Sequence, residues 1–409
     1  MSRALIPIFL IVLVDVFGLT LVLPLQAIYA EKLGASPLQA TMLVSVFAVC
    51  QLVASPLLGS WSDRIGRKSV LIFSQLGAIV GYLAMASASS IWMLYLARVI
   101  QGTTAGNLSI AQAYIADNSE AKDRAKSFAI IGIAFGIDFF IGPALTGMLV
   151  RYGLAAPIFV AALMSALSLV CTLLLLPGEV SVRSAQSDVA LPGGKRLSVF
   201  EWRVYLQYFE RPVLRAMLIQ FLFFAMCFSV FMSGFSLYAE RRYVYDGHPF
   251  TPREIGYLFA FSGFLGLILQ GGMIGRLVKR FGERGLVLSG FVSLVIGFSI
   301  LAGTDTLAGL VISTSISTYG NAVVRPTLSS LISQSAARHE QGTVIGLTQS
   351  LQSVAQIVAP FLAGLLLERH MLWQWGAMAA IASLLGLMMA PLGSQKAVSA
   401  AQVVATDAH

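Results

Sequence analysis

The chain has 409 residues, of which 57% are hydrophobic and only 11% are charged, and its formal net charge is +8. Soluble domains carry about 25% charged residues, so this composition excludes an ordinary soluble protein and indicates a chain surrounded mostly by lipid. The positive charge lies in loops between apolar segments, which makes it a topology signal. We expect no nucleic-acid partner.

Apolar runs long enough to cross a bilayer, which takes roughly 20 helical residues, recur along nearly the whole sequence. In hydrocarbon, each backbone polar group must be satisfied within its own segment, so helices are the expected form. The sequence therefore predicts an all-α membrane protein with twelve transmembrane helices. They are expected near 5–29, 40–60, 69–88, 92–115, 125–149, 156–177, 213–239, 254–275, 285–303, 307–333, 342–367 and 372–392.

The first span carries one charged residue, Asp15. It lies about ten residues into the span, roughly 15 Å deep at 1.5 Å per residue. A carboxylate at that depth is costly unless it is paired or protonated. Asp15 is therefore the leading candidate for a proton carrier, and a purely structural ion pair is the alternative.

The loop between the second and third spans, GSWSDRIGRK from Gly59 to Lys68, is short and highly charged. A degenerate copy, GRLVKRFGER, occupies Gly275 to Arg284, a shift of 216 residues. Further matches at nearly the same shift are Gly106 with Gly320, Asn107 with Asn321, Pro143 with Pro360 and Gly147 with Gly364. The chain is predicted to be duplicated into two pseudo-symmetric six-helix bundles, an arrangement typical of alternating-access transporters with a site between the halves.

The fourth span contains Arg98. A permanently charged guanidinium inside a membrane should face the bundle interior, and Asp15 is its natural partner. We expect Arg98 to modulate the protonation of Asp15 or to stabilise the cavity. A structural anchor is the alternative.

The fifth span adds a second carboxylate at mid-membrane depth, Asp138. Its predicted roles are an additional proton site, a ligand for a cationic substrate, or the partner of Arg98 or Arg325. A satisfied structural pair is the alternative.

A polar insert divides the two halves and sets the domain boundaries. We expect a first bundle at 1–178, a cytoplasmic linker with an interfacial helix at 179–212, a second bundle at 213–393 and a disordered tail at 394–409. The predicted inner loops hold nineteen Lys and Arg residues and the outer loops six; the other two of the 27 are Arg98 and Arg325. This asymmetry places both termini in the cytoplasm, and the cell inner membrane is the expected location.

Polar residues inside other spans define a candidate substrate cavity. Arg325 precedes Pro326, which indicates a helix break facing the cavity, although a snorkelling side chain is the alternative. Three glutamines of the eleventh span recur at i, i+3 and i+7, and so share one face. The predicted cavity residues are Asn107, Gln112, Gln220, Asn321, Arg325, Gln349, Gln352 and Gln356.

Several of these motifs, in register along the whole chain, resemble the major facilitator superfamily, and specifically its twelve-helix drug:proton antiporter branch with the tetracycline efflux proteins. Asp15, Gly18 and Pro24 match the DxxGxxxxxP pattern of the first helix, and LARVIQG from Leu96 to Gly102 is similar to the arginine motif of the fourth. The loop from Gly59 to Lys68 resembles the cytoplasmic signature in full. HEQG, from His339 to Gly342, resembles a late loop of tetracycline exporters.

The resemblance implies roles for two residue groups. The cytoplasmic gate comprises Gly59, Asp63, Arg64, Gly66, Arg67, Lys68, Asp117 and Arg124, in which Arg67 pairs with Asp117 and Asp63 caps a helix of the other bundle. Lys279 replaces that aspartate in the second copy, so gating should be asymmetric. The antiporter-type motif of the fifth helix comprises Gly132, Gly136, Gly142, Pro143 and Gly147. Asp138 departs from the glycine usual there in tetracycline exporters. The acidic residues that those exporters carry in the third and ninth helices appear here as Gly81 and, approximately, Leu294, which puts tetracycline in doubt as the substrate.

The sequence thus predicts a secondary active transporter that exports small lipophilic compounds in exchange for protons by alternating access. Its expected partners are the substrate, protons and the lipid bilayer, and a monomer is expected. We predict no enzyme activity, no metal site and no cofactor beyond the proton gradient. A symporter, uniporter or lipid flippase on the same fold remains open, as does a non-transporting membrane receptor or sensor.

Overall fold

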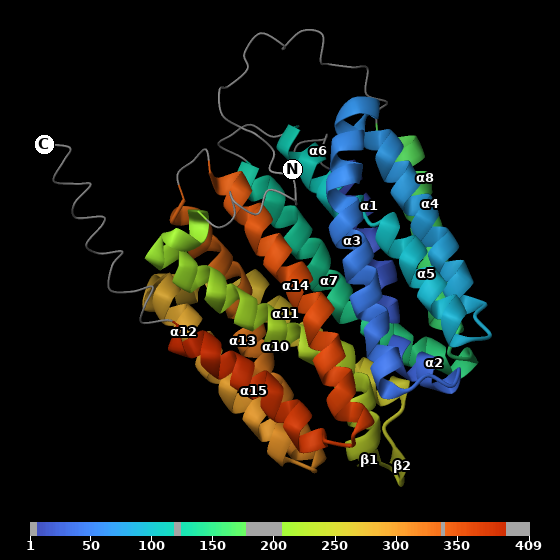
Figure 1. Ribbon diagram of the computed structural model, residues 1–409, viewed down its shortest axis with the longest axis vertical. Helices are drawn as coiled ribbons and strands as arrows, with labels where there is room; N and C mark the ends of the chain where they lie inside the picture. Colours follow the sequence, from blue (N-terminus) through green and yellow to red (C-terminus); the bar gives the residue numbers. More distant parts are fainter. Residues whose placement is uncertain (1–5, 118–123, 177–206, 337–339, 390–409) are drawn as a thin grey trace, which may run out of the picture. The chain divides into compact units, whose positions relative to one another are not determined.

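The computed structural model describes residues 6–117, 124–176, 207–336 and 340–389. These residues are almost entirely helical, with one two-stranded antiparallel ribbon, β1 (Val244–Tyr245) and β2 (His248–Pro249) (Figure 1). The helices of the first half are α1 (Ile6–Val22), α2 (Gln26–Lys32), α3 (Pro37–Ile65), α4 (Arg67–Ala86), α5 (Ile91–Thr103), α6 (Asn107–Asp117), α7 (Arg124–Leu149) and α8 (Ala156–Leu175). Those of the second half are α10 (Pro212–Arg242), α11 (Pro252–Ile268), α12 (Ile274–Gly303), α13 (Leu307–Gln334), α14 (Gln341–Glu368) and α15 (Leu372–Met388). Short helices at Val150–Tyr152 and Leu269–Met273 complete the described structure.

Each of the twelve expected spans coincides with a helix or a broken helix. By length and composition, eight described helices are long and apolar enough to cross a membrane, or nine if α1 and α2, which meet at 44°, form one span. The difference from twelve has local causes. The fourth span is divided into α5 and α6, α15 has only 17 residues, and α11 and α12 run together with the short helix between them. Pro24 sits at the bend of the first span, where its missing N–H ends the helix.

The predicted duplication is visible in the backbone of the two charged loops. Gly66, between α3 and α4, has φ 96° and ψ 148°, and Gly282, within α12, has φ 68° and ψ 161°. The two glycines are 216 residues apart, which is the shift of the sequence repeat. Only glycine adopts this conformation readily, so both halves break their helix at the same position of the motif.

A helix contact repeats at the same shift. A Cβ added to Gly81 on α4 would collide with Gln101 and lie 3.2 Å from the backbone oxygen of Ala97 on α5. A Cβ added to Gly297 on α12 would lie 3.0 Å from both the Cβ of Ser317 and the backbone oxygen of Ser313 on α13. The pairs 81 with 297, 97 with 313 and 101 with 317 are each 216 apart. The two halves therefore pack one helix pair in the same way.

Contacts divide the chain into two compact units. The first comprises Met1–Leu191 and Met232–Leu267, and in it α1 packs against α7 and α8, and α4 against α5 and α8. The second comprises Pro192–Phe231 and Ile268–His409, and in it α12 packs against α13 and α15. The domain boundaries predicted from the sequence remain a prediction; the linker from 179 to 206 and the tail from 394 lie outside the described residues.

Within the first unit, α7 and α11 cross at glycines. A Cβ added to Gly263 would collide with the backbone of Phe139, and one added to Gly256 would lie 2.6 Å from the backbone oxygen of Pro143. Next to this crossing, the rings of Phe140 and Phe264 lie 5.4 Å apart. The absence of side chains at the two glycines allows the helix backbones to touch.

We expect Gly263→Ala to lower the stability of the protein by about 1–3 kcal/mol, because the added methyl group overpacks a backbone contact that cannot relax by a rotamer change. The thermal unfolding midpoint of the detergent-purified protein measures this. Gly266→Ala, on the same helix, is the matched control, since its Cβ would meet nothing within 4 Å. Equal midpoints for the two variants would show that the crossing is looser than described.

Candidate functional site

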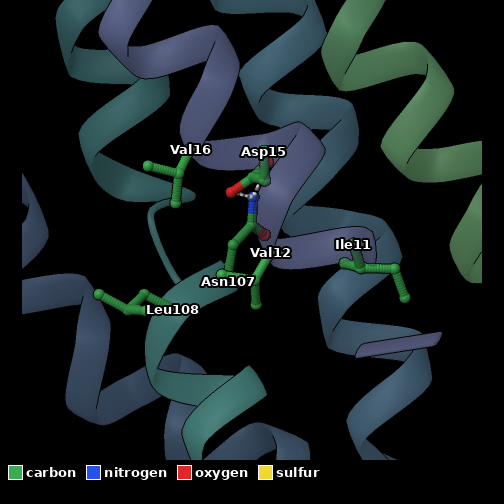
Figure 2. Close-up of a pocket in the computed structure, with 6 residues that line it drawn as sticks. All are labelled: Ile11, Val12, Asp15, Val16, Asn107 and Leu108. Atoms are coloured by element: carbon green, nitrogen blue, oxygen red, sulfur yellow. Dashed lines mark hydrogen bonds between the residues drawn. The ribbon is translucent and has the colours of Figure 1, made fainter. Parts of the chain in front are cut away.

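Asp15 lies in the middle of α1 and is half-buried. Its carboxylate accepts hydrogen bonds from Asn107 on α6: Nδ2 is 2.8 Å from Oδ1 and 2.8 Å from Oδ2 (Figure 2). One amide nitrogen thus donates to both carboxylate oxygens. Such hydrogen bonds to a charged group are stronger than neutral ones, so Asn107 is a principal partner of the carboxylate.

The break in the fourth span places Asn107 at this position. The chain leaves helical geometry at Thr104, whose hydroxyl donates to the carbonyl of Ile100 at 2.8 Å, and resumes it at Asn107. The break lies close to α4, because a Cβ on Gly77 would collide with Thr104 and one on Gly106 would lie 2.9 Å from Ser74 Oγ. Small residues on both sides therefore accommodate the interruption that starts α6 beside Asp15.

A small pocket opens at this pair, with a volume of about 10 Å³. Its wall consists of Asp15, Asn107 and apolar residues of α1 and α6: Ile11, Val12, Val16 and Leu108 (Figure 2). A volume of about 10–15 Å³ is the least that holds a water molecule. The pocket is therefore of a size for a water or a proton donor, and far too small for a drug-sized compound.

Arg98, on α5, is 5% exposed and donates from Nη1 to Gln101 Oε1 at 2.7 Å. Its guanidinium also lies 5.9 Å from the ring centroid of Phe47. The predicted pairing with Asp15 is wrong for this structure, because Gln101 sits one turn along the same helix and takes the hydrogen bond. Among the described residues, no carboxylate lies within ion-pair distance of Arg98, and its Nε has no hydrogen-bond partner.

Asp138, on α7, is fully buried, and neither carboxylate oxygen has a hydrogen-bond partner among the described residues. The predicted partnership with Arg98 or Arg325 is therefore not formed in this structure. Gly142, one turn further along α7, packs on Thr20 of α1, so this face of α7 is turned towards α1. Asp138 lies close enough to Asp15 for the two groups to interact electrostatically. Two carboxyl groups of neighbouring helices thus share one region of the first unit.

The glycines of the fifth-helix motif form packing surfaces. A Cβ on Gly147 would lie 2.9 Å from the backbone oxygen of Arg253 on α11, and one on Gly136 would lie 3.3 Å from Leu267. Pro143 is buried and lies inside α7. With Gly142 against α1, the motif lets α7 contact both α1 and α11. The surroundings of Gly132 are outside the described structure.

The charged loop is held together by its own residues. Arg67 Nη1 lies 2.6 Å from Asp63 Oδ1 and donates to Ser62 Oγ at 2.6 Å. Lys68 donates to the carbonyls of Leu173 and Leu176 at 3.0 and 2.5 Å, and so binds the carboxyl end of α8. Arg64 lies in the last turn of α3. Gly59, with nothing within 4 Å of an added Cβ, lies about one and a half turns before it. The side chains of Asp117 and Arg124 lie outside the described residues, so the predicted Arg67–Asp117 pair stays a prediction.

The late HEQG motif reaches the start of α10. Arg211 donates from both terminal nitrogens to Glu340, each at 2.8 Å. This forked hydrogen bond raises the pKa of Arg211 above its ordinary value. His339 lies outside the described residues, and so do the surroundings of Gly342.

The remaining cavity candidates differ in burial and in hydrogen-bond partners. Gln220 is buried and donates to the carbonyl of Gly386 at 3.2 Å, which makes it a helix-packing residue of the second unit. Asn321 donates to the carbonyl of Ser317 in its own helix. Arg325 and Gln349 are exposed, Gln112 and Gln356 are half-buried, and Gln352 is buried. α13 continues through Pro326 without interruption, so the predicted break at Arg325 is wrong.

Sequence reasoning missed an ion pair at the predicted outer ends of the first and seventh spans. Arg241 Nη2 lies 2.6 Å from Glu31 Oε1, and Ser236 on α10 donates to the carbonyl of Pro24 at 2.8 Å. Both contacts lie within the first unit. The sequence signal that could have indicated this pair is the opposite charge of Glu31 and Arg241 at the ends of two repeat-related spans. The pair joins α2 to the carboxyl end of α10.

The model of the Major Facilitator Superfamily matches residues 8–360 and, in a second match, 246–400. The chain belongs to this superfamily. It is thus a secondary transporter for a small molecule, an integral multi-pass membrane protein and not an enzyme. The fold class and the family resemblance read from the sequence are confirmed.

Relatives within the superfamily include drug resistance proteins. The chain is 28% identical over 357 residues to the tetracycline resistance protein, class B, of Escherichia coli, which covers 86% of this chain and 85% of that protein. It is 26% identical over 373 residues to multidrug resistance protein 2 of Bacillus subtilis, covering 88% and 89%. Its fold is similar to that of the human organic anion transporter MFSD10 (TETRAN), with a TM-score of 0.68 and 23% identity over 94% of this chain and 99% of that one.

Proposed function

We propose that this major facilitator protein exports small lipophilic compounds in exchange for protons by alternating access. The observation that carries the proposal is the Asp15 carboxylate, half-buried in the middle of a membrane span and bordering a pocket the size of a water molecule. Intramembrane carboxyl groups are costly and mark proton relays. Asp138, buried beside it without a partner in the described structure, is the second proton site.

The substrate class rests on the relatives. Tetracycline resistance and multidrug resistance proteins are similar along most of the chain, which supports a small lipophilic cargo for this chain also. One charge moved down 100 mV supplies about 2.3 kcal/mol. Since about 1.4 kcal/mol is a tenfold ratio, one proton supports roughly fifty-fold extrusion of an uncharged compound. Proton exchange is thus energetically adequate for resistance.

We propose that the protein lies in the cell inner membrane as a monomer. The distribution of Lys and Arg supports a cytoplasmic position for both termini. The loop from Gly59 to Lys68 is the cytoplasmic gate.

Proton release on substrate binding tests the exchange. Purified protein in weakly buffered detergent solution is mixed with tetracycline or ethidium, and a pH indicator records the protons released. We expect release with at least one of the two probes, and none from Asp15→Asn. Binding without release, in the parent protein and at every pH, would overturn antiport.

A second candidate is the transport of organic anions by the same fold. Arg98 favours it, because this buried guanidinium has no neutralising carboxylate among the described residues, and a related fold is that of an organic anion transporter. Equilibrium binding of salicylate to the purified protein distinguishes the two. Saturable binding that is lost in Arg98→Gln supports the anion transporter; its absence supports the exporter of lipophilic compounds.

A further inference from the structure

The amide of Asn107 uses only half of its hydrogen-bonding capacity. Its Nδ2 donates to both oxygens of Asp15 at 2.8 Å, while its Oδ1 is buried and has no partner in the described structure. A buried carbonyl oxygen left unpaired costs about 1–3 kcal/mol. The arrangement therefore suits an ionised carboxylate, which is an acceptor only, and leaves one acceptor unused.

Protonation of Asp15 changes the carboxyl group from an acceptor only to a group that also donates a hydrogen bond. The neutral carboxyl group has an O–H donor that needs an acceptor. The other residues around the pocket are Ile11, Val12, Val16 and Leu108, which offer no side-chain acceptor (Figure 2). The unused Oδ1 of Asn107 is the acceptor that the same pocket provides.

We infer that Asn107 is the positioning residue that holds Asp15 in both protonation states, by turning its side-chain amide when the proton binds. With the proton bound, Oδ1 accepts from the carboxyl O–H while Nδ2 donates to the other carboxyl oxygen, a closed pair of two hydrogen bonds. The proton comes from water reaching the pocket and forms an O–H bond; no other covalent bond changes. This deepens the proposed function and rests on Asp15 being its proton carrier.

Few other groups near Asp15 can titrate. Tyr82 on α4 interacts electrostatically with both Asp15 and Arg98, and Asp138 on α7 interacts with Asp15. The helices that pack against α1 are α6, α7 and α8; their remaining charged or titratable residues are Tyr114, Asp117, Arg124, Lys126 and Cys171. Tyr114 and Cys171 belong to an apolar cluster around Ile11, and the other three side chains lie outside the described residues. Asn107 is the neighbour that bonds the carboxylate directly.

Infrared difference spectroscopy across a pH titration tests the amide rotation in the purified protein. The chain has three asparagines, Asn107, Asn118 and Asn321, so isotope-labelled asparagine gives few side-chain amide bands. The band that disappears in Asn107→Leu is assigned to Asn107. We expect that band to shift in step with the acid band of Asp15, which is identified by its loss in Asp15→Asn. An Asn107 band that stays constant while Asp15 titrates would overturn the inference.

Transport by variants gives a second, independent readout. We expect Asn107→Leu to slow pH-driven ethidium efflux about tenfold, the equivalent of one hydrogen bond of about 1.4 kcal/mol, and to displace its pH profile. Ser109→Leu, at an exposed position of the same helix, controls for damage to α6. An unchanged profile in Asn107→Leu would contradict the inference and leave proton exchange standing. Coupled infrared bands without pH-driven flux would contradict the proposed function alone.

Discussion

Asp15→Asn is expected to abolish energised export while leaving a folded protein. Asparagine has the size of aspartate and keeps an acceptor for Asn107, but it cannot bind and release a proton at physiological pH. Exchange of one proton for one ethidium cation moves no net charge, so only the pH difference drives it. The steady-state concentration ratio of ethidium should be about tenfold per pH unit in the parent protein and should fall to unity in the variant. Fluorescence of ethidium in energised inverted membrane vesicles measures this ratio.

The control for this variant is Asp246→Asn, in the turn between β1 and β2. That residue is exposed and has φ 50°, a conformation that asparagine tolerates as well as aspartate. It should accumulate ethidium as the parent protein does. Accumulation by Asp15→Asn at the parent level would remove Asp15 from the coupling mechanism.

Asp138→Asn is expected to weaken coupling without ending it. The carboxyl group is fully buried and has no partner in the described structure, and an uncompensated charge there costs several kcal/mol. Replacing it by a neutral amide therefore leaves the fold intact and removes one of two proton sites. The concentration ratio of ethidium should drop below that of the parent and stay above unity, because Asp15 still exchanges its proton.

The two carboxylates are ranked by comparing the two variants in the same vesicles. Proton release per bound substrate should be lost in Asp15→Asn and reduced in Asp138→Asn. If Asp138→Asn alone abolishes both release and accumulation, Asp138 is the principal carrier and Asp15 the accessory one.

The sequence predicted the helices and the duplication because both depend on local patterns. Apolar runs of bilayer length reveal spans whatever their neighbours are. Gly66 and Gly282, which are 216 residues apart, have similar backbone angles, as the sequence repeat predicts. The fold class followed from these two features. The exact span boundaries did not, since the interruption between α5 and α6 depends on contacts with Gly77 and Ser74 of another helix.

The partners of the buried charges were not predictable in the same way. Opposite charges suggested Arg98 with Asp15, whereas the structure pairs Arg98 with Gln101 and Asp15 with Asn107. The preference arises from helix geometry: Gln101 is one turn from Arg98 on the same helix, and the break in the span starts α6 at Asn107. A hydrophobic pattern contains no information about which polar residue a neighbouring helix presents.

Proton exchange is tested most directly by the purified protein in proteoliposomes with an imposed pH gradient and no other energy source. Ethidium movement is followed with the gradient in one direction and then reversed, with the potential clamped by potassium and valinomycin. We expect uphill ethidium movement opposite to the proton flow in both cases, and none in Asp15→Asn. Ethidium flux that ignores the gradient, or that follows the protons in the same direction, would contradict it.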